Sequence, residues 1–221
     1  MASSHTAHKD NFTLMLVTVI GLLFFSALAE HVLDESNLVL VNFVVTMTLL
    51  VAIWSMHTER AWRAARTIGS LVLVAVMFGD LLMDTLHLEL FNLALLVFLL
   101  ALASFSTGRQ VIFPKIINAN IVVGAMVLYL LMGLLWAIAY LLVEEFSPGS
   151  MRGLDGENWQ ANLQTVIYYS FVTISTLGYG DLVPQQPVSQ FLAYMEAITG
   201  QFYLSVLVAS LVSASFGGSK E

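Results

Sequence analysis

The chain has 221 residues, of which 58% are hydrophobic and only 10% charged, and its formal net charge is −7. Soluble domains carry about 45–50% apolar and about 25% charged residues, so this chain has too few charges to cover a water-facing surface. The composition excludes a soluble enzyme, a nucleic-acid-binding protein and a disordered chain. Long apolar runs exclude a membrane β-barrel, and the absence of cysteine excludes disulfides and thiolate metal sites. A helical integral membrane protein remains.

Six apolar runs follow one another along the chain, and a helix needs about 20 such residues to cross the hydrocarbon core of a bilayer. The runs cover residues 12–29, 38–56, 68–86, 90–105, 121–143 and 187–216. A seventh uncharged segment, 159–180, is interrupted by polar residues and is therefore expected to re-enter the membrane without spanning it. The predicted fold is an all-α membrane protein with six spans and a re-entrant pore helix and loop between spans five and six.

The basic residues agree with six crossings, because Lys and Arg are enriched in cytoplasmic loops. With both termini in the cytoplasm, only Arg152 falls on the outer side. The inner side then holds Lys9, Arg60, Arg63, Arg66, Arg109, Lys115 and Lys220. A full crossing by 159–180 would move the C-terminus outside, so the charges favour the re-entrant interpretation.

The spans are expected to divide into a peripheral and a pore-forming unit. Residues 1–106 would form a four-helix peripheral domain, and 107–118 an interfacial linker. Residues 119–216 would form the pore domain, followed by a short cytoplasmic tail, 217–221. The sequence predicts no soluble regulatory domain.

The re-entrant segment contains the residues that carry the chemistry, from Thr176 to Asp181, with the sequence TLGYGD. A potassium ion that enters a narrow pore exchanges part of its hydration shell for backbone carbonyl oxygens. Aiming successive carbonyls at one axis needs backbone angles that favour glycine, and Gly178 and Gly180 alternate as this requires. Thr176 would add a hydroxyl at the inner end, and Tyr179 would point away from the axis.

This run resembles the selectivity filter of tetrameric potassium channels, with Leu177 in place of the commoner Val. The preceding residues, 168–175, resemble a pore helix, and Pro184 after the filter also fits this family. Gly200, twenty residues after the last filter glycine, falls where many potassium channels have an inner-helix hinge. The resemblance covers roughly residues 121–216 and is of the six-span type without a charged voltage-sensor helix.

The resemblance implies a homotetramer in a lipid bilayer, because one chain supplies one strand of a four-fold ring of carbonyls. The expected ion-coordinating residues are Thr176, Leu177, Gly178, Tyr179 and Gly180, with K⁺ bound at the first four. Potassium is then the permeant ion, and neither a cofactor nor a catalytic residue is expected.

Other residues are expected to support the filter and to form the inner pore. The predicted support residues are Tyr168, Tyr169, Thr173, Asp181 and Glu196. Gly200 would let the last helix bend, and Leu204, Val208 and Val212 follow it at helical spacing, where they would line the inner pore.

Glu196 is an ionisable residue inside a predicted span, which is a functional hypothesis by default. It lies about 13 Å into the last run at 1.5 Å per residue, near the depth of the filter and on the same helix face as Gly200. It either ties the helix to the filter and titrates, or is a structural residue bonded to Ser170, Thr173 or Gln201. The sequence leaves both interpretations open.

The fourth run, 90–105, contains no charged residue, whereas voltage-gated channels move about three to four charges per subunit. Asp80 and Asp84 share one face of the third run. They form a cation or ligand site, or a remnant of a voltage-sensor cluster, or they simply face water near the outer surface, which is the favoured interpretation. Opening is therefore expected to depend at most weakly on voltage.

The sequence thus predicts a passive potassium-selective channel, located in a prokaryotic plasma membrane. The alternatives are a weakly selective cation channel and a non-conducting auxiliary or scaffold subunit. A secondary transporter is disfavoured because no inverted repeat is visible.

Overall fold

The computed structural model describes five segments of the chain and two single residues. These are residues 12–32, 64, 67–75, 86–112, 119–154, 156 and 158–217. Side chains are described over the same residues except 29–32, 86–89, 208 and 210–217. The predicted second span, Asp80 and Asp84 lie outside the described residues.

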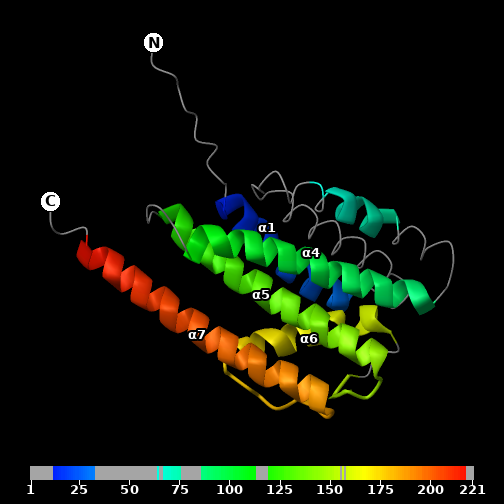
Figure 1. Cartoon of the computed structure of the whole chain (residues 1–221). Coiled ribbons are helices and arrows are strands. Elements are labelled where there is room, and N and C mark those ends of the chain that lie inside the picture. The colour runs from blue at the N-terminus through cyan, green and yellow to red at the C-terminus, as the bar shows by residue number, and fades with distance from the viewer. Residues whose placement is uncertain are drawn as a thin grey trace.

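The described chain is mostly helical. The helices are α1 (Phe12–Val32), α4 (Leu86–Ile112), α5 (Ala119–Phe146), α6 (Trp159–Ile174) and α7 (Pro187–Gly217), and two short strands are β1 (Met151–Arg152) and β2 (Val183–Pro184). A further helical segment covers residues 67–75. The central helix is α5, which contacts each of the other four labelled helices. In Figure 1 it lies between α4 and α7, and α6 lies beside the half of α7 that follows the loop.

The bounds of α1, α5 and α7 agree with the predicted apolar runs within three residues, whereas those of α4 and α6 differ from the expectation. The helix α4 continues to Ile112, so half of the predicted linker is helical. Within it the Thr107 hydroxyl donates to the Ala103 carbonyl oxygen (3.0 Å), which satisfies this polar group inside the helix. The helix α6 begins nine residues earlier than the predicted pore helix, because the Asn158 side chain accepts a hydrogen bond from the Ala161 amide and caps it.

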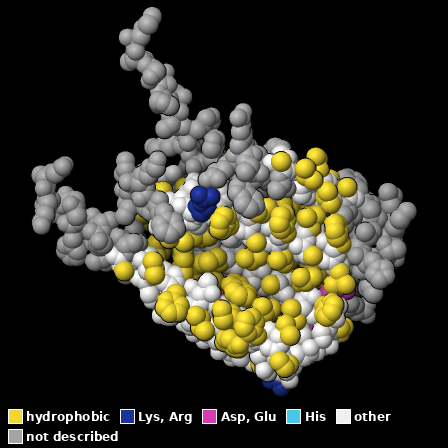
Figure 2. All heavy atoms as spheres, in the orientation of Figure 1, with side chains coloured by type: hydrophobic (Ala, Val, Ile, Leu, Met, Phe, Trp, Pro, Cys, Tyr) yellow, Lys and Arg dark blue, Asp and Glu magenta, His cyan; other side chains and the backbone are white. Residues whose placement is uncertain are grey.

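Two helices in the described part of the chain are long and apolar enough to cross a membrane, Leu90–Ile112 and Ala119–Phe146. Figure 2 shows a face of the molecule where hydrophobic side chains predominate and charged ones are few. These features are typical of a membrane protein. The number of spans and the re-entrant course of α6 stay predictions.

A short antiparallel ladder connects the two sides of the loop region. Met151 pairs with Pro184 and Arg152 with Val183. The Glu144 carboxylate fastens the turn before β1 by accepting hydrogen bonds from the Gly149 amide, the Ser150 hydroxyl and the Met151 amide. The segment after α5 and the segment before α7 are thereby held together outside the helices.

Candidate pore loop and its supports

The pore-loop backbone turns back onto the end of α6 directly after that helix. The amide of Thr176 donates to the Thr173 carbonyl oxygen (2.9 Å). The amides of Leu177 and Gly178 both donate to the carbonyl oxygen of Val172, at 2.9 and 3.3 Å. The backbone amides of this segment are therefore hydrogen-bonded to α6. These bonds position the segment and leave the carbonyl groups of the segment unused.

Alternate residues of the pore loop have positive φ angles. The values are 61° at Thr176, 59° at Gly178 and 80° at Gly180. Only glycine adopts this region without strain, and Thr176 is the single non-glycine residue with positive φ in the described chain. The backbone thus alternates between positive and negative φ. This alternation turns successive peptide groups so that they present the same edge to one side.

The carbonyl oxygens of residues 176–180 accept no hydrogen bond from any described residue. The side chains of Leu177 and Tyr179 are 56% and 66% exposed, and a Cβ added at Gly178 or Gly180 would meet nothing within 4 Å. The segment thus lies at the surface of the single chain, with a row of carbonyl groups that have no partner among the described residues.

The two tyrosines before the loop have different positions. Tyr168 stacks on Tyr179, with ring centroids 6.3 Å apart, and its hydroxyl donates to Oδ2 of Asp181 (2.8 Å). That hydrogen bond holds the pKa of Asp181 below its usual range. Tyr169 is buried and packs edge-on against Tyr140 on α5, with centroids 5.1 Å apart. Within one chain, Tyr168 contacts the loop and Tyr169 contacts the supporting helix.

Glu196 is completely buried on α7, where it joins three helices. Its Oε2 accepts a hydrogen bond from the Tyr140 hydroxyl of α5 (2.7 Å). Its Oε1 lies 2.5 Å from the Ser170 hydroxyl of α6, which also lies 2.7 Å from the Gly133 carbonyl oxygen of α5. A buried carboxylate requires such donors. The sequence suggested Ser170 as a partner, but nothing local pointed to Tyr140, which is 56 residues away.

Two glycines let the long helices approach α6 closely. A Cβ at Gly200 of α7 would collide with the carbonyl group of Ile174, the last residue of α6. A Cβ at Gly133 of α5 would come within 2.6 Å of the Phe171 ring. Gly200 therefore has a packing role at the base of the loop, in addition to the hinge role expected from its sequence position.

The remaining residues predicted to line the inner pore follow Gly200 along α7. The Leu204 side chain is 38% exposed. Val208 and Val212 lie in the helix but outside the residues whose side chains are described. No cluster of His, Asp or Glu that could hold a metal ion occurs within the described segments.

Two long helices enclose a shorter helix and a loop whose carbonyl groups accept no hydrogen bond from described residues. This arrangement is a candidate ion-conducting unit. Residues 122–216, which contain this whole arrangement except the first residues of α5, match the family model described as "Ion channel". This part of the chain is therefore similar to ion channel domains.

A curated relative makes the comparison more specific. Over 93 residues the chain is 34% identical to the inward rectifier potassium channel Kirbac3.1 of Paramagnetospirillum magnetotacticum. The alignment covers 40% of this chain and 27% of that protein, so the chain spans little more than a quarter of its relative's length. No solved structure matches the chain. Both comparisons are thus similarities to channel proteins.

Proposed function

We propose that the chain forms a passive potassium-selective channel, with Thr176, Leu177, Gly178, Tyr179 and Gly180 as its selectivity filter. The row of carbonyl groups that accept no hydrogen bond from described residues carries this proposal. Carbonyl oxygens of this kind replace the hydration shell of K⁺ in a narrow pore. The alternating positive φ angles supply the backbone geometry, and the amides bound to α6 hold the strand in place.

A single strand cannot surround an ion, so the proposal includes a homotetramer around a central axis. Large apolar side chains are exposed on α7 near the loop, among them Phe191 (48%) and Tyr194 (53%). Exposed apolar surface of this kind marks a site of contact with protein or lipid. In the tetramer, the filter strands and part of α7 from four copies face one another, and the lipid bilayer covers the outer helices.

The same proposal includes the finer features of the predicted topology: six spans, a re-entrant α6, cytoplasmic termini and a prokaryotic plasma membrane. Between Leu90 and Ile112, the described side chains of α4 include one charged residue, Arg109. Moving one charge across the membrane is worth about 2.3 kcal/mol per 100 mV, so α4 offers too few charges for a steep response. A conductance–voltage curve in symmetric potassium should therefore be shallow.

A reversal-potential measurement tests the function. Purified protein is placed in planar bilayers with opposed tenfold gradients of potassium and sodium. A potassium-selective channel reverses near the potassium equilibrium potential, about 59 mV from zero for a monovalent ion. A reversal near 0 mV would identify the weakly selective cation channel, and the absence of current would favour the auxiliary subunit. Either result would contradict the proposal.

A further inference from the structure

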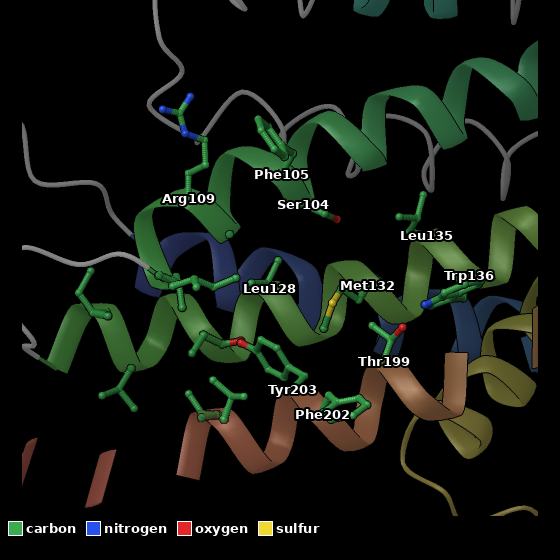
Figure 3. A pocket seen from close by; sticks show the side chains of 18 of the residues that line it. Ser104, Phe105, Arg109, Leu128, Met132, Leu135, Trp136, Thr199, Phe202 and Tyr203 are labelled. Atoms are coloured by element: carbon green, nitrogen blue, oxygen red, sulfur yellow. The ribbon is translucent and has the colours of Figure 1, made fainter. Parts of the chain in front are cut away.

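The contact between α5 and α7 is sparse in the described part of the chain. The helix α7 touches α5 less extensively than α1, α4 and α6 do. A groove of about 1080 Å³ opens between α4, α5 and α7, and side chains of all three helices line it, among them Phe105, Leu128 and Phe202 (Figure 3). Apolar packing therefore holds α7 on α5 only weakly, so single polar contacts have a large share in fixing its position.

A first polar contact connects α7 to α5 one turn before Gly200. The buried carboxylate of Glu196 accepts hydrogen bonds from the hydroxyl groups of Tyr140 on α5 and Ser170 on α6. The same Ser170 hydroxyl lies 2.7 Å from the Gly133 carbonyl oxygen of α5. These bonds fix α7 at the depth of Gly133.

The second contact is formed by Tyr203, three residues after Gly200. Its hydroxyl donates to the carbonyl oxygen of Ala125 on α5, at 2.5 Å. Its ring stacks on that of Tyr129, one turn further along α5, with centroids 5.9 Å apart and planes 26° apart. Figure 3 shows the Tyr203 side chain in the space between the two helices. One side chain of α7 thus spans a full turn of α5.

The two contacts have matching spacings on the two helices. Glu196 and Tyr203 are seven residues apart, about 10.5 Å along α7. Gly133 and Ala125 are eight residues apart, about 12 Å along α5. Since these rises are nearly equal, α5 and α7 run side by side over about two turns. Gly200 lies within this stretch and packs against the end of α6, so α7 is held before, at and after this glycine.

We propose that Tyr203 is a positioning residue of the ion pathway, which holds the inner half of α7, residues 204–217, on α5. While its hydroxyl binds the Ala125 carbonyl oxygen, α7 stays straight through Gly200. The inner half of the helix leaves α5 only after this bond breaks. The effect on ions rests on the proposed channel function, whereas the contact itself belongs to the single chain.

This hydrogen bond is strong enough to bias the helix and weak enough to break. Beyond Tyr203, the side chains of Leu204 and Val206 are 38% and 58% exposed, so burial against α5 contributes little there. The Ala125 carbonyl oxygen also accepts the Tyr129 amide within the α-helix, so it keeps a partner when Tyr203 leaves. A net hydrogen bond changes a population about fivefold. In a tetramer whose four chains move together, the factors multiply to about 600-fold.

Distances between spin labels on α5 and α7 test the contact. The chain has no cysteine, so two introduced cysteines are the only labelled residues. Met126→Cys with Ser205→Cys places labels at exposed positions near Tyr203. Phe146→Cys with Val188→Cys reports the opposite ends of the same two helices, also at exposed positions. Each labelled chain is diluted with an excess of an otherwise identical unlabelled chain, so that the distances arise within one copy.

Tyr203→Phe should increase the population with a longer distance at the first pair at least fivefold and leave the second pair unchanged. Tyr129→Phe is the matched control, because it removes a hydroxyl from the same contact and keeps both the ring stack and the Tyr203 hydrogen bond. Unchanged distances at the first pair in Tyr203→Phe would overturn the proposal. An equal change at both pairs, or the same change in Tyr129→Phe, would also overturn it.

Single-channel recording separates this proposal from the channel function. Tyr203→Phe should change the open probability at least fivefold and leave the reversal potential at the wild-type value, because the filter residues are unaltered. A change in label distances without any potassium current overturns the channel function alone. Potassium current with unchanged label distances and open probability overturns the role of Tyr203 alone.

Discussion

Replacing Gly178 by alanine tests the filter assignment most directly. The φ angle at this position is 59°, and an added Cβ would meet no atom within 4 Å. Within one chain, the substitution therefore acts through the backbone conformation and not through a steric collision. A left-handed conformation costs an L-residue with a Cβ about 1–2 kcal/mol. In a proposed ring of four filters the penalty reaches about 4–8 kcal/mol, because every copy carries the substitution.

Such a penalty should be visible in permeation. Every 1.4 kcal/mol is a tenfold change in an equilibrium, so the intact ring conformation becomes about a thousand-fold less populated or rarer still. We expect Gly178→Ala to lose potassium current, or to shift the reversal potential towards zero under opposed potassium and sodium gradients. Folding of the single chain is expected to survive, because the added methyl group meets no atom of the same chain within 4 Å.

Gly149 provides a matched control for this experiment. Its φ is 79°, an added Cβ there also meets nothing within 4 Å, and it lies in the turn before β1, away from the filter. Gly149→Ala should carry a similar backbone penalty and leave the reversal potential unchanged. A wild-type reversal potential in Gly178→Ala, or an equal shift in both variants, would refute the reasoning.

Three further substitutions test the supports of the loop. Gly200→Ala places a Cβ against the carbonyl group at the end of α6, and overpacking of this kind costs about 1–3 kcal/mol. We expect a lower thermal midpoint for the detergent-solubilised protein. Tyr140→Phe removes a hydroxyl donor from the buried carboxylate of Glu196, which should cost about 1–3 kcal/mol in the same thermal assay. Tyr168→Phe removes the hydrogen bond that lowers the pKa of Asp181. That pKa should rise, so the negative charge is lost at a higher pH, which a pH titration of the potassium current should detect.

Each of these variants has a control in the same chain. Gly108→Ala adds a Cβ in ordinary contact, 3.7 Å from Leu128, and should leave the thermal midpoint almost unchanged. Tyr194→Phe removes an exposed hydroxyl and should also have little effect. In the pH titration of the potassium current, Asp181→Asn should abolish the response whose midpoint pH is shifted in Tyr168→Phe. Equal effects of a variant and its control would contradict the packing or hydrogen-bonding role assigned here.

Local patterns in the sequence were sufficient for α1, α5 and α7 and for the location of the loop. The apolar run predicted at 187–216 agrees with α7, which ends at Gly217, because continuous apolarity is a property of neighbouring residues. The alternating glycines likewise coincide with positive φ angles at Gly178 and Gly180. Steric limits on φ act within a single residue, so the sequence alone can indicate them.

Local patterns did not determine how far each helix extends beyond its most apolar part. The helix α4 continues through the polar stretch that begins at Thr107, and α6 begins at Trp159. In both cases side chains bond to backbone groups of the same helix, Thr107 to Ala103 and Asn158 to Ala161. Hydropathy does not register such bonds, because it scores these side chains only as polar.

Tertiary structure decided the contacts between helices. Tyr168 and Tyr169 are adjacent and chemically identical, yet one contacts the loop and the other packs against α5. The sequence around each residue does not indicate the hydrogen bond between Tyr140 and Glu196. It also does not indicate the close approach of Gly200 to the end of α6. These contacts join residues on different helices, and they form only when α5, α6 and α7 pack at a particular depth and rotation. Apolarity and glycine spacing in the sequence indicate the class of protein, whereas helix packing selects which side chains support the loop.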